Sequence, residues 1–134
     1  MQNSIGPLAA RGAAAFCLAF AAFQVALAFG APFGDVAWGG STPVLAPPMR
    51  WASAAAAIYL LIAAGLMEVR AGDWGEGLPR WLPFAFNVFL ALQLALNTLA
   101  NLAAKSGAER YGMGAASSLG CVLCVLALIP ARRA

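Results

Sequence analysis

Four long apolar stretches constrain the fold of this chain more than any other feature of its sequence. They cover about 12–31, 51–67, 81–104 and 112–129, and none contains Asp, Glu, Lys or Arg. Each is close to the roughly 20 apolar residues that a helix needs to cross a bilayer. Because 63% of the 134 residues are hydrophobic and only 10% are charged, a soluble core of this size could not hide the apolar surface. The sequence predicts an all-α, integral membrane four-helix bundle.

Prolines support these boundaries, and the chain length limits the number of domains. Pro47 and Pro48 precede the second stretch, and Pro83 falls in the first turn of the third, where its missing N–H costs little. Short loops predict antiparallel neighbours. Since 134 residues correspond to one domain, we expect a single transmembrane domain over 1–134.

The basic residues are distributed unevenly between the two predicted sides of the membrane. The side that holds both chain ends carries Arg11, Arg70, Arg80, Arg132 and Arg133. The opposite side carries Arg50, Lys105 and Arg110. The positive-inside rule therefore predicts a multi-pass protein of the cell membrane, an inner membrane in bacteria, with the N- and C-termini in the cytoplasm.

The absence of ionisable side chains from the apolar stretches narrows the chemistry. Proton-coupled transport and acid–base catalysis inside a membrane depend on such groups. The sequence has no His, which excludes a Ser-His-Asp triad and a His-ligated metal. The scattered basic residues form no face for nucleic acid. We therefore expect a protein that is not an enzyme, has no cofactor and does not bind nucleic acid.

Amide side chains form the most distinctive polar feature of the third stretch. Gln93, Asn97 and Asn101 recur at four-residue intervals, so they share one face of a helix. Since an amide that faces lipid is costly, this stripe should face protein or a wet cavity. It could provide hydrogen bonds between helices or line a ligand site. Gln24 in the first stretch is the expected partner across the bundle.

The loop after the first stretch, residues 32–49, combines glycines and prolines with large apolar residues. It contains Phe33, Val36 and Trp38, which a solvated linker would not need. We expect this outer loop to fold back as a cap over the helix ends, with Trp38 as a plug or interfacial anchor. It could carry function, as loops on rigid scaffolds often do, or be a connector that follows the membrane surface.

Charged residues on the same outer side complete the candidate site. Arg50 could pair with Glu109, and Asp35 with Arg110, or these charges could stay separately solvated. A basic rim would also suit an anionic lipid head group. The candidate ligand-binding residues are therefore Gln24, Trp38, Arg50, Gln93, Asn97, Asn101 and Glu109.

The fourth stretch contains two spacing patterns. Gly112, Ala116, Gly120 and Cys124 would let a neighbouring helix approach closely, within the bundle or in a second copy. Cys121 and Cys124 have the redox Cys-x-x-Cys spacing, which membrane thiol oxidoreductases of the vitamin K epoxide reductase type also carry. Those enzymes use further cysteines in an outer loop, and this outer loop has none. We expect free thiols packed as small hydrophobes.

Several short motifs carry a resemblance over most of the chain. They are Gly30-Ala-Pro-Phe-Gly34, Trp38-Gly-Gly40, Pro48-Met-Arg50 and Glu109-Arg110. With them the chain resembles small four-transmembrane-helix bacterial membrane proteins that are uncharacterised. The resemblance implies the topology and no activity.

Three hypotheses for function follow from these patterns. The first is a protein that binds or passes a membrane lipid or small hydrophobic molecule within the four-helix bundle. The second is a non-catalytic accessory subunit of a larger membrane protein complex, which predicts that the small-residue face of the fourth stretch points outward and that the isolated chain is monomeric and empty. The possible partners are a membrane protein or, in a homo-oligomer, a second copy of the chain. The third is a membrane thiol oxidoreductase, which requires Cys121 and Cys124 to reach the outer surface.

Overall fold

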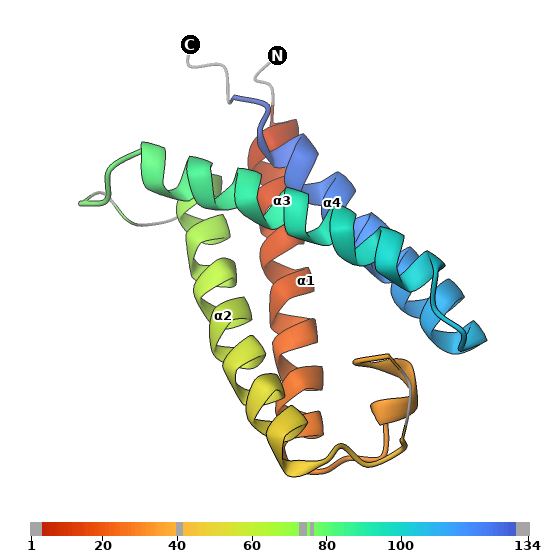
Figure 1. Ribbon diagram of the computed structural model, residues 1–134. Helices are drawn as coiled ribbons and strands as arrows, with labels where there is room; N and C mark the ends of the chain where they lie inside the picture. Colours follow the sequence, from red (N-terminus) through yellow and green to blue (C-terminus); the bar gives the residue numbers. More distant parts are fainter. Residues whose placement is uncertain (1–3, 40–41, 73–74, 76, 131–134) are drawn as a thin grey trace.

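A computed structural model describes residues 4–39, 42–72, 75 and 77–130. Over these residues the chain is all-helical and contains no strand, which confirms the predicted fold class (Figure 1). The long helices are α1 (Ile5–Ala28), α2 (Pro47–Ala71), α3 (Trp81–Leu102) and α4 (Gly114–Ala127). A 3-10 turn, η1 (Gly34–Val36), lies in the outer loop, and a π-helix, η2 (Ala108–Met113), leads directly into α4. Arg132, Arg133 and Gly40 lie outside the described residues.

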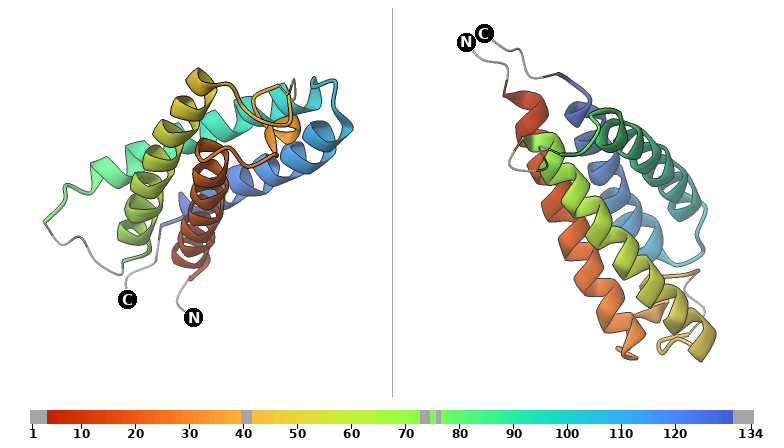
Figure 2. Two further views of the ribbon diagram at one scale, coloured as in Figure 1. Left: turned by 90° about the horizontal axis from the view of Figure 1, so that it is seen from below. Right: turned by 90° about the vertical axis from the view of Figure 1, so that its left-hand side faces the viewer.

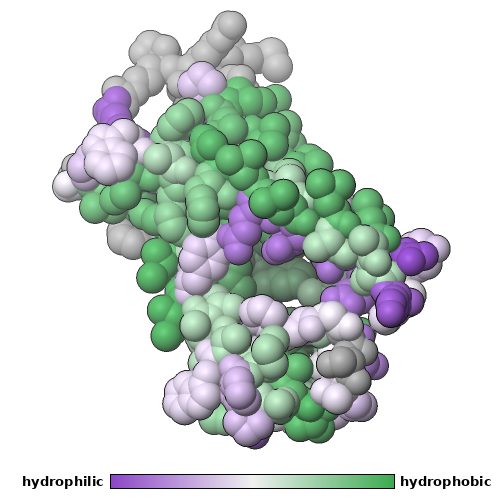
Figure 3. All heavy atoms as spheres, in the orientation of Figure 1, coloured by the Kyte–Doolittle hydropathy of each residue, from purple (hydrophilic) through white to green (hydrophobic). Residues whose placement is uncertain are grey.

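Each of these helical segments, with η2 and α4 taken together, is long and apolar enough to cross a membrane. Large hydrophobic side chains such as Ile58, Ile62 and Leu96 are more than half exposed on the outside of the bundle. Apolar residues cover much of the upper part of the surface in Figure 3. Such a surface is unfavourable in water and suits contact with lipid tails. The chain is therefore a multi-pass integral membrane protein.

The observed helix ends differ from the predicted ones in ways that the local chemistry explains. α1 begins at Ile5 rather than near residue 12, because Arg11 marks a water boundary but does not stop a helix. α2 begins at Pro47 rather than near 51, since proline is tolerated in a first helical turn. It continues past 67 to Ala71, where Gly72 adopts a left-handed φ of 90° and ends the helix.

The helices pair as two hairpins. α1 packs most extensively on α2, α3 packs mainly on α4, and α2 and α3 have the fewest contacts of the neighbouring helices. The hairpin of α3 and α4 is inclined across the hairpin of α1 and α2 (Figures 1 and 2). The largest core cluster lies where the hairpins cross, and its small residues let the backbones approach closely. It consists of Ala13, Ala14, Cys17, Ala63, Ala64, Met67, Leu90, Ala91, Leu94 and Cys124.

The end of the bundle that holds Ile5 and Ala127, called the inner end after the predicted orientation, is tightly connected. The Arg70 guanidinium donates two hydrogen bonds to the Ala127 carbonyl, at 2.9 and 2.6 Å. Asn87 Nδ2 donates to the Cys124 carbonyl at 3.1 Å. From this end the hairpins diverge toward the outer loop (Figure 2). The divergence positions the candidate site between them.

Candidate functional site

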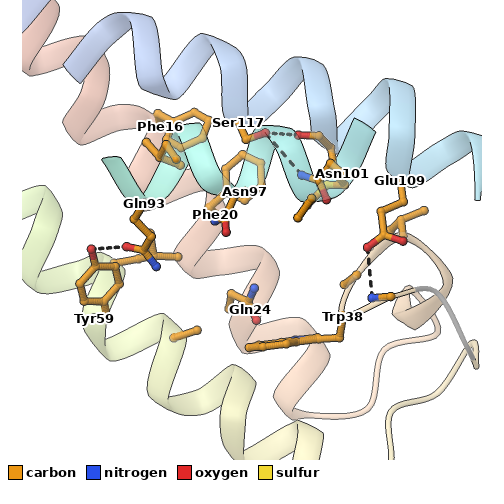
Figure 4. A pocket seen from close by; sticks show the side chains of 18 of the residues that line it. Phe16, Phe20, Gln24, Trp38, Tyr59, Gln93, Asn97, Asn101, Glu109 and Ser117 are labelled. Atoms are coloured by element: carbon orange, nitrogen blue, oxygen red, sulfur yellow. Dashed lines mark hydrogen bonds between the residues drawn. The ribbon is translucent and has the colours of Figure 1, made fainter. Parts of the chain in front are cut away.

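A cavity of about 420 Å³ lies between the two hairpins and beneath the outer loop. All four long helices, η1, η2 and the outer loop contribute to its walls. Phe16, Phe20 and Leu60 are among its apolar residues, and its polar residues include several amides and the carboxylate of Glu109 (Figure 4). In the space-filling view the molecule is hollowed where hydrophilic side chains interrupt the apolar surface (Figure 3).

The structure brings most of the sequence-predicted site residues to this one cavity. Those that line it are Gln24, Trp38, Gln93, Asn97, Asn101 and Glu109. Arg50 is not among the lining residues. The predicted set therefore forms one site, apart from its arginine.

The amide stripe of α3 is divided between hydrogen bonds and the cavity. Gln93 Oε1 accepts a hydrogen bond from the Tyr59 hydroxyl at 2.5 Å. Asn101 Nδ2 donates to Ser117 Oγ at 3.4 Å. Asn97, between them, lines the cavity, is exposed, and has no side-chain hydrogen bond to the described residues. The stripe therefore connects helices at both ends and leaves one amide available to a ligand.

The expected pairing of Gln24 with the stripe is wrong. Its Oε1 is buried and has no hydrogen-bond partner among the described residues. The reason is geometric, because the cavity lies between α1 and α3 at this level (Figure 4). Tyr59 of α2 provides the hydrogen bond to Gln93 instead. Sequence reasoning overlooked Tyr59, although its hydroxyl needs a partner within an apolar span.

Glu109 is the charged residue of the cavity. Its side chain is only 6% exposed, and Oε1 accepts a hydrogen bond from the backbone N–H of Gly39 at 3.1 Å. Oε2 is buried and has no partner among the described residues. Glu109 lies in the π-helix η2, a type of wide turn that is rare and often found at functional sites.

The outer loop folds back over the cavity, as expected of a cap. Within the loop, the Gly34 N–H donates to the Pro43 carbonyl at 2.7 Å, and Ala37 and Leu45 pack against Leu27 of α1. The Trp38 indole N–H donates to Ser53 Oγ of α2 at 3.0 Å. These contacts attach the loop to both helices of the first hairpin.

Trp38 reaches this position through an uncommon backbone conformation. Its φ is +53° and that of Gly39 is +92°, so both residues lie in the left-handed region. For a bulky residue such as tryptophan this region is unfavourable by roughly 1–2 kcal/mol. The turn directs the Trp38 indole toward Ser53 and the backbone N–H of Gly39 toward Glu109. The unfavourable conformation of this one turn is therefore accompanied by two hydrogen bonds.

Neither of the predicted ion pairs at the rim is present among the described residues. Arg50 Nε donates to the Ala28 carbonyl at 2.8 Å. Arg110 donates twice to the Ala104 carbonyl, at 3.1 and 2.8 Å. Both carbonyls lie at or just beyond helix C-termini, where unpaired carbonyl groups and the helix dipole attract cations. Arg50 and Arg110, which were expected to form a basic rim for an anionic head group, therefore bind backbone carbonyls instead.

The cysteines and part of the small-residue row at the end of the chain pack within the bundle. All three cysteines are free; Cys17 and Cys124 are buried, and Cys121 is half-buried. Cys124 lies in the main core cluster, away from the outer surface that the thiol hypothesis requires. Gly120 also faces inward, whereas Gly112 is exposed. Among the described residues no three His, Cys, Asp or Glu side chains form a group that could hold a metal ion.

Comparison with known proteins gives no further assignment. No protein-family model matches the chain, and no curated protein or solved structure is significantly similar to it.

Proposed function

We propose that this membrane protein binds a lipid or another small amphipathic molecule in the cavity beneath the outer loop. The observation that carries the proposal is the composition of one cavity of about 420 Å³. This volume falls in the range of about 300–1,000 Å³ that ligand sites usually occupy. An apolar wall with a few converging polar groups is also typical of such sites.

The apolar wall suits a hydrocarbon chain or ring. Phe16 and Phe20 of α1 stack with ring centroids 4.5 Å apart. Leu60, Leu90 and Leu94 extend this surface from α2 and α3. A ligand that covers these side chains gains roughly 25 cal/mol for each Å² of apolar surface that it buries.

The polar wall suits a head group. Asn97, Asn101 and Ser117 of α3 and α4 provide polar atoms to the cavity wall (Figure 4). Asn101 and Ser117 are hydrogen-bonded to each other, whereas the Asn97 amide, without such a bond, is costly in a membrane unless water or a ligand satisfies it. A molecule with both an apolar body and a polar head therefore matches the cavity better than a purely apolar one.

The surroundings of the cavity favour binding over passage through the bundle. The cluster around Ala13, Ala63 and Cys124 closes the space between the cavity and the inner end. Access from the bilayer is easier, because α2 and α3 have the fewest contacts of the neighbouring helices. A lipid could enter sideways between these two helices.

Filling the cavity provides a direct test. Ala56 lines the cavity, so Ala56→Phe should occupy it. Ala55, its exposed neighbour on the same helix, provides the matched control Ala55→Phe. In native mass spectrometry of the mildly solubilised protein, wild type and the control should retain a lipid-sized adduct that Ala56→Phe lacks.

Two results would count against the proposal. Wild-type protein without any adduct, even after incubation with membrane lipid extract, would contradict it. An adduct that survives Ala56→Phe unchanged would place the lipid elsewhere. A protein that retains no lipid and copurifies with a larger membrane complex would favour the accessory-subunit hypothesis.

A further inference from the structure

We infer that the ligand of this cavity carries a cationic amino head group that binds Glu109. The inference rests on the proposed function and adds the chemical class of the ligand. It is carried by Glu109, which lines the cavity and has one buried carboxylate oxygen without a hydrogen-bond partner among the described residues.

The buried groups without partners in the cavity wall are hydrogen-bond acceptors. Glu109 Oε2 and Gln24 Oε1 are both buried and unpaired among the described residues, and both residues line the cavity. An unpaired buried acceptor is unfavourable until a donor reaches it. The site therefore calls for a ligand with N–H or O–H groups rather than one with acceptors only.

The charge of the wall selects between these two kinds of donor. Glu109 is the only charged side chain among the described residues that line the cavity. Arg50 and Arg110 form no ion pair with it among the described residues, and they donate instead to the backbone carbonyls of Ala28 and Ala104. Its other oxygen is held by a neutral backbone N–H, that of Gly39. In a medium of low dielectric constant a carboxylate in this setting favours a cation and disfavours an anion.

Aromatic side chains around the cavity favour the same charge. Trp38, Tyr59, Phe16 and Phe20 all line it. The negative faces of such rings attract ammonium groups, with tryptophan the strongest partner. Aromatic rings and one carboxylate together are a suitable environment for an amine at the end of an apolar chain.

The experiment compares three probes that share one alkyl chain: dodecylamine, 1-dodecanol and dodecanoate. Binding to the full chain in neutral maltoside micelles is followed by tryptophan fluorescence at neutral pH. Ala56→Phe, with its cavity filled, provides the blank for partition into the micelle. Wild type should bind the amine most tightly, the alcohol less tightly and the carboxylate least.

Two variants assign this preference to Glu109. Glu109→Gln keeps the shape and removes the charge, so it should weaken amine binding roughly ten- to a hundredfold, the range for a lost charge-assisted hydrogen bond. The affinity for the alcohol should fall by less, because the Gln amide can donate a hydrogen bond to the alcohol oxygen in return, and retained alcohol binding also shows that the variant is folded. Asp35→Asn removes an exposed carboxylate from the outer loop and should change neither affinity.

The outcomes separate this inference from the proposed function. If the alcohol binds wild type as tightly as the amine, the cationic head group is wrong and the cavity remains a lipid site. If no probe gives a signal above the Ala56→Phe blank, the proposed function itself fails. If the Glu109→Gln protein does not fold, the ranking of the three probes on wild type still tests the inference, because that ranking does not depend on the variant.

Discussion

The Tyr59 hydroxyl of α2 donates a hydrogen bond to Gln93 Oε1 of α3, with 2.5 Å between the two oxygens. This bond joins the two neighbouring helices that otherwise have the fewest contacts with each other. Both residues line the cavity. The bond therefore holds the two hairpins together at the point where a ligand from the bilayer would enter between them.

Removal of this hydroxyl should weaken the contact between the hairpins. Tyr59→Phe keeps the ring, which also packs against Phe86 with centroids 5.7 Å apart, and removes only the hydrogen bond. We expect unfolding in detergent to become easier by about 0.6–1.7 kcal/mol, the range for polar contacts between membrane helices. A double-mutant cycle with Gln93→Leu should give a coupling energy of similar size. Additive effects of the two substitutions would contradict the hydrogen bond.

A second prediction concerns Ser117, which connects α4 to α3. Its Oγ accepts hydrogen bonds from Thr98 Oγ1 at 3.0 Å and Asn101 Nδ2 at 3.4 Å. Ser117→Ala should destabilise the protein by about 0.5–1.5 kcal/mol, because Asn101 loses its hydrogen bond to α4, while Thr98 can still donate to the Leu94 carbonyl at 2.8 Å. Ser118 donates only within its own helix, to the Gly114 carbonyl. Ser118→Ala should therefore change the unfolding free energy by no more than about 0.5 kcal/mol. Equal losses for both variants would overturn this assignment.

The fold could be predicted from the sequence because its signal is local. A span such as 81–104 is mostly apolar and contains no charge along its whole length, and in lipid only a helix satisfies the backbone of such a span. The stripe of Gln93, Asn97 and Asn101 could be predicted for the same reason, since helical spacing alone puts the three amides on one face.

The partners within the site could not be predicted, because they depend on how the two hairpins are inclined. That angle places Tyr59, rather than Gln24, against Gln93. The orientation of Arg50 was also inaccessible, since the rim charges suggested an ion pair with Glu109. In the structure a carbonyl at the end of α1 receives the Arg50 guanidinium. Such carbonyls are present at every helix end and leave no mark in the sequence.

The small-residue row of the last helix leads to a third prediction, because its two glycines differ. A Cβ at Gly120 would lie 2.7 Å from the Phe16 ring and 3.1 Å from a Leu94 methyl, whereas a Cβ at Gly112 would meet nothing within 4 Å. Gly120→Ala should therefore cost about 1–3 kcal/mol of stability through overpacking. Gly112→Ala should be neutral or stabilising by up to about 1 kcal/mol, since alanine favours helix. Thermal unfolding of both variants in the same detergent measures the difference, and a neutral Gly120→Ala would contradict the close packing of α4 on α1.

The fourth prediction tests the attachment of the outer loop to α2. Ser53 is fully buried and accepts the indole N–H of Trp38. Ser53→Ala removes this anchor, and the unfavourable φ of Trp38 then has less to maintain it. Hydrogen–deuterium exchange should become faster at Gly34 and Gly39, whose amides are bonded across the loop and to Glu109. Exchange in the middle of α1 should stay the same. Unchanged exchange in the loop would mean that the indole contact does not hold it.

The fifth prediction concerns orientation, which follows from the charges. The ends of α1 and α4 at Ile5 and Ala127 lie at the same end of the bundle, opposite the outer loop (Figure 1). The excess of basic residues on the side of the chain ends predicts that this end faces the cytoplasm. In intact cells, a membrane-impermeant maleimide should therefore label Asp35→Cys in the exposed outer loop and not Ser4→Cys, which is also exposed. Wild type provides the blank, because Cys17 and Cys124 are buried and Cys121 is half-buried. Permeabilised cells should expose Ser4→Cys as well. The reverse labelling pattern would show that the molecule has the opposite orientation. The cavity would then lie on the side of the cytoplasmic leaflet, and its ligand would have to come from that leaflet.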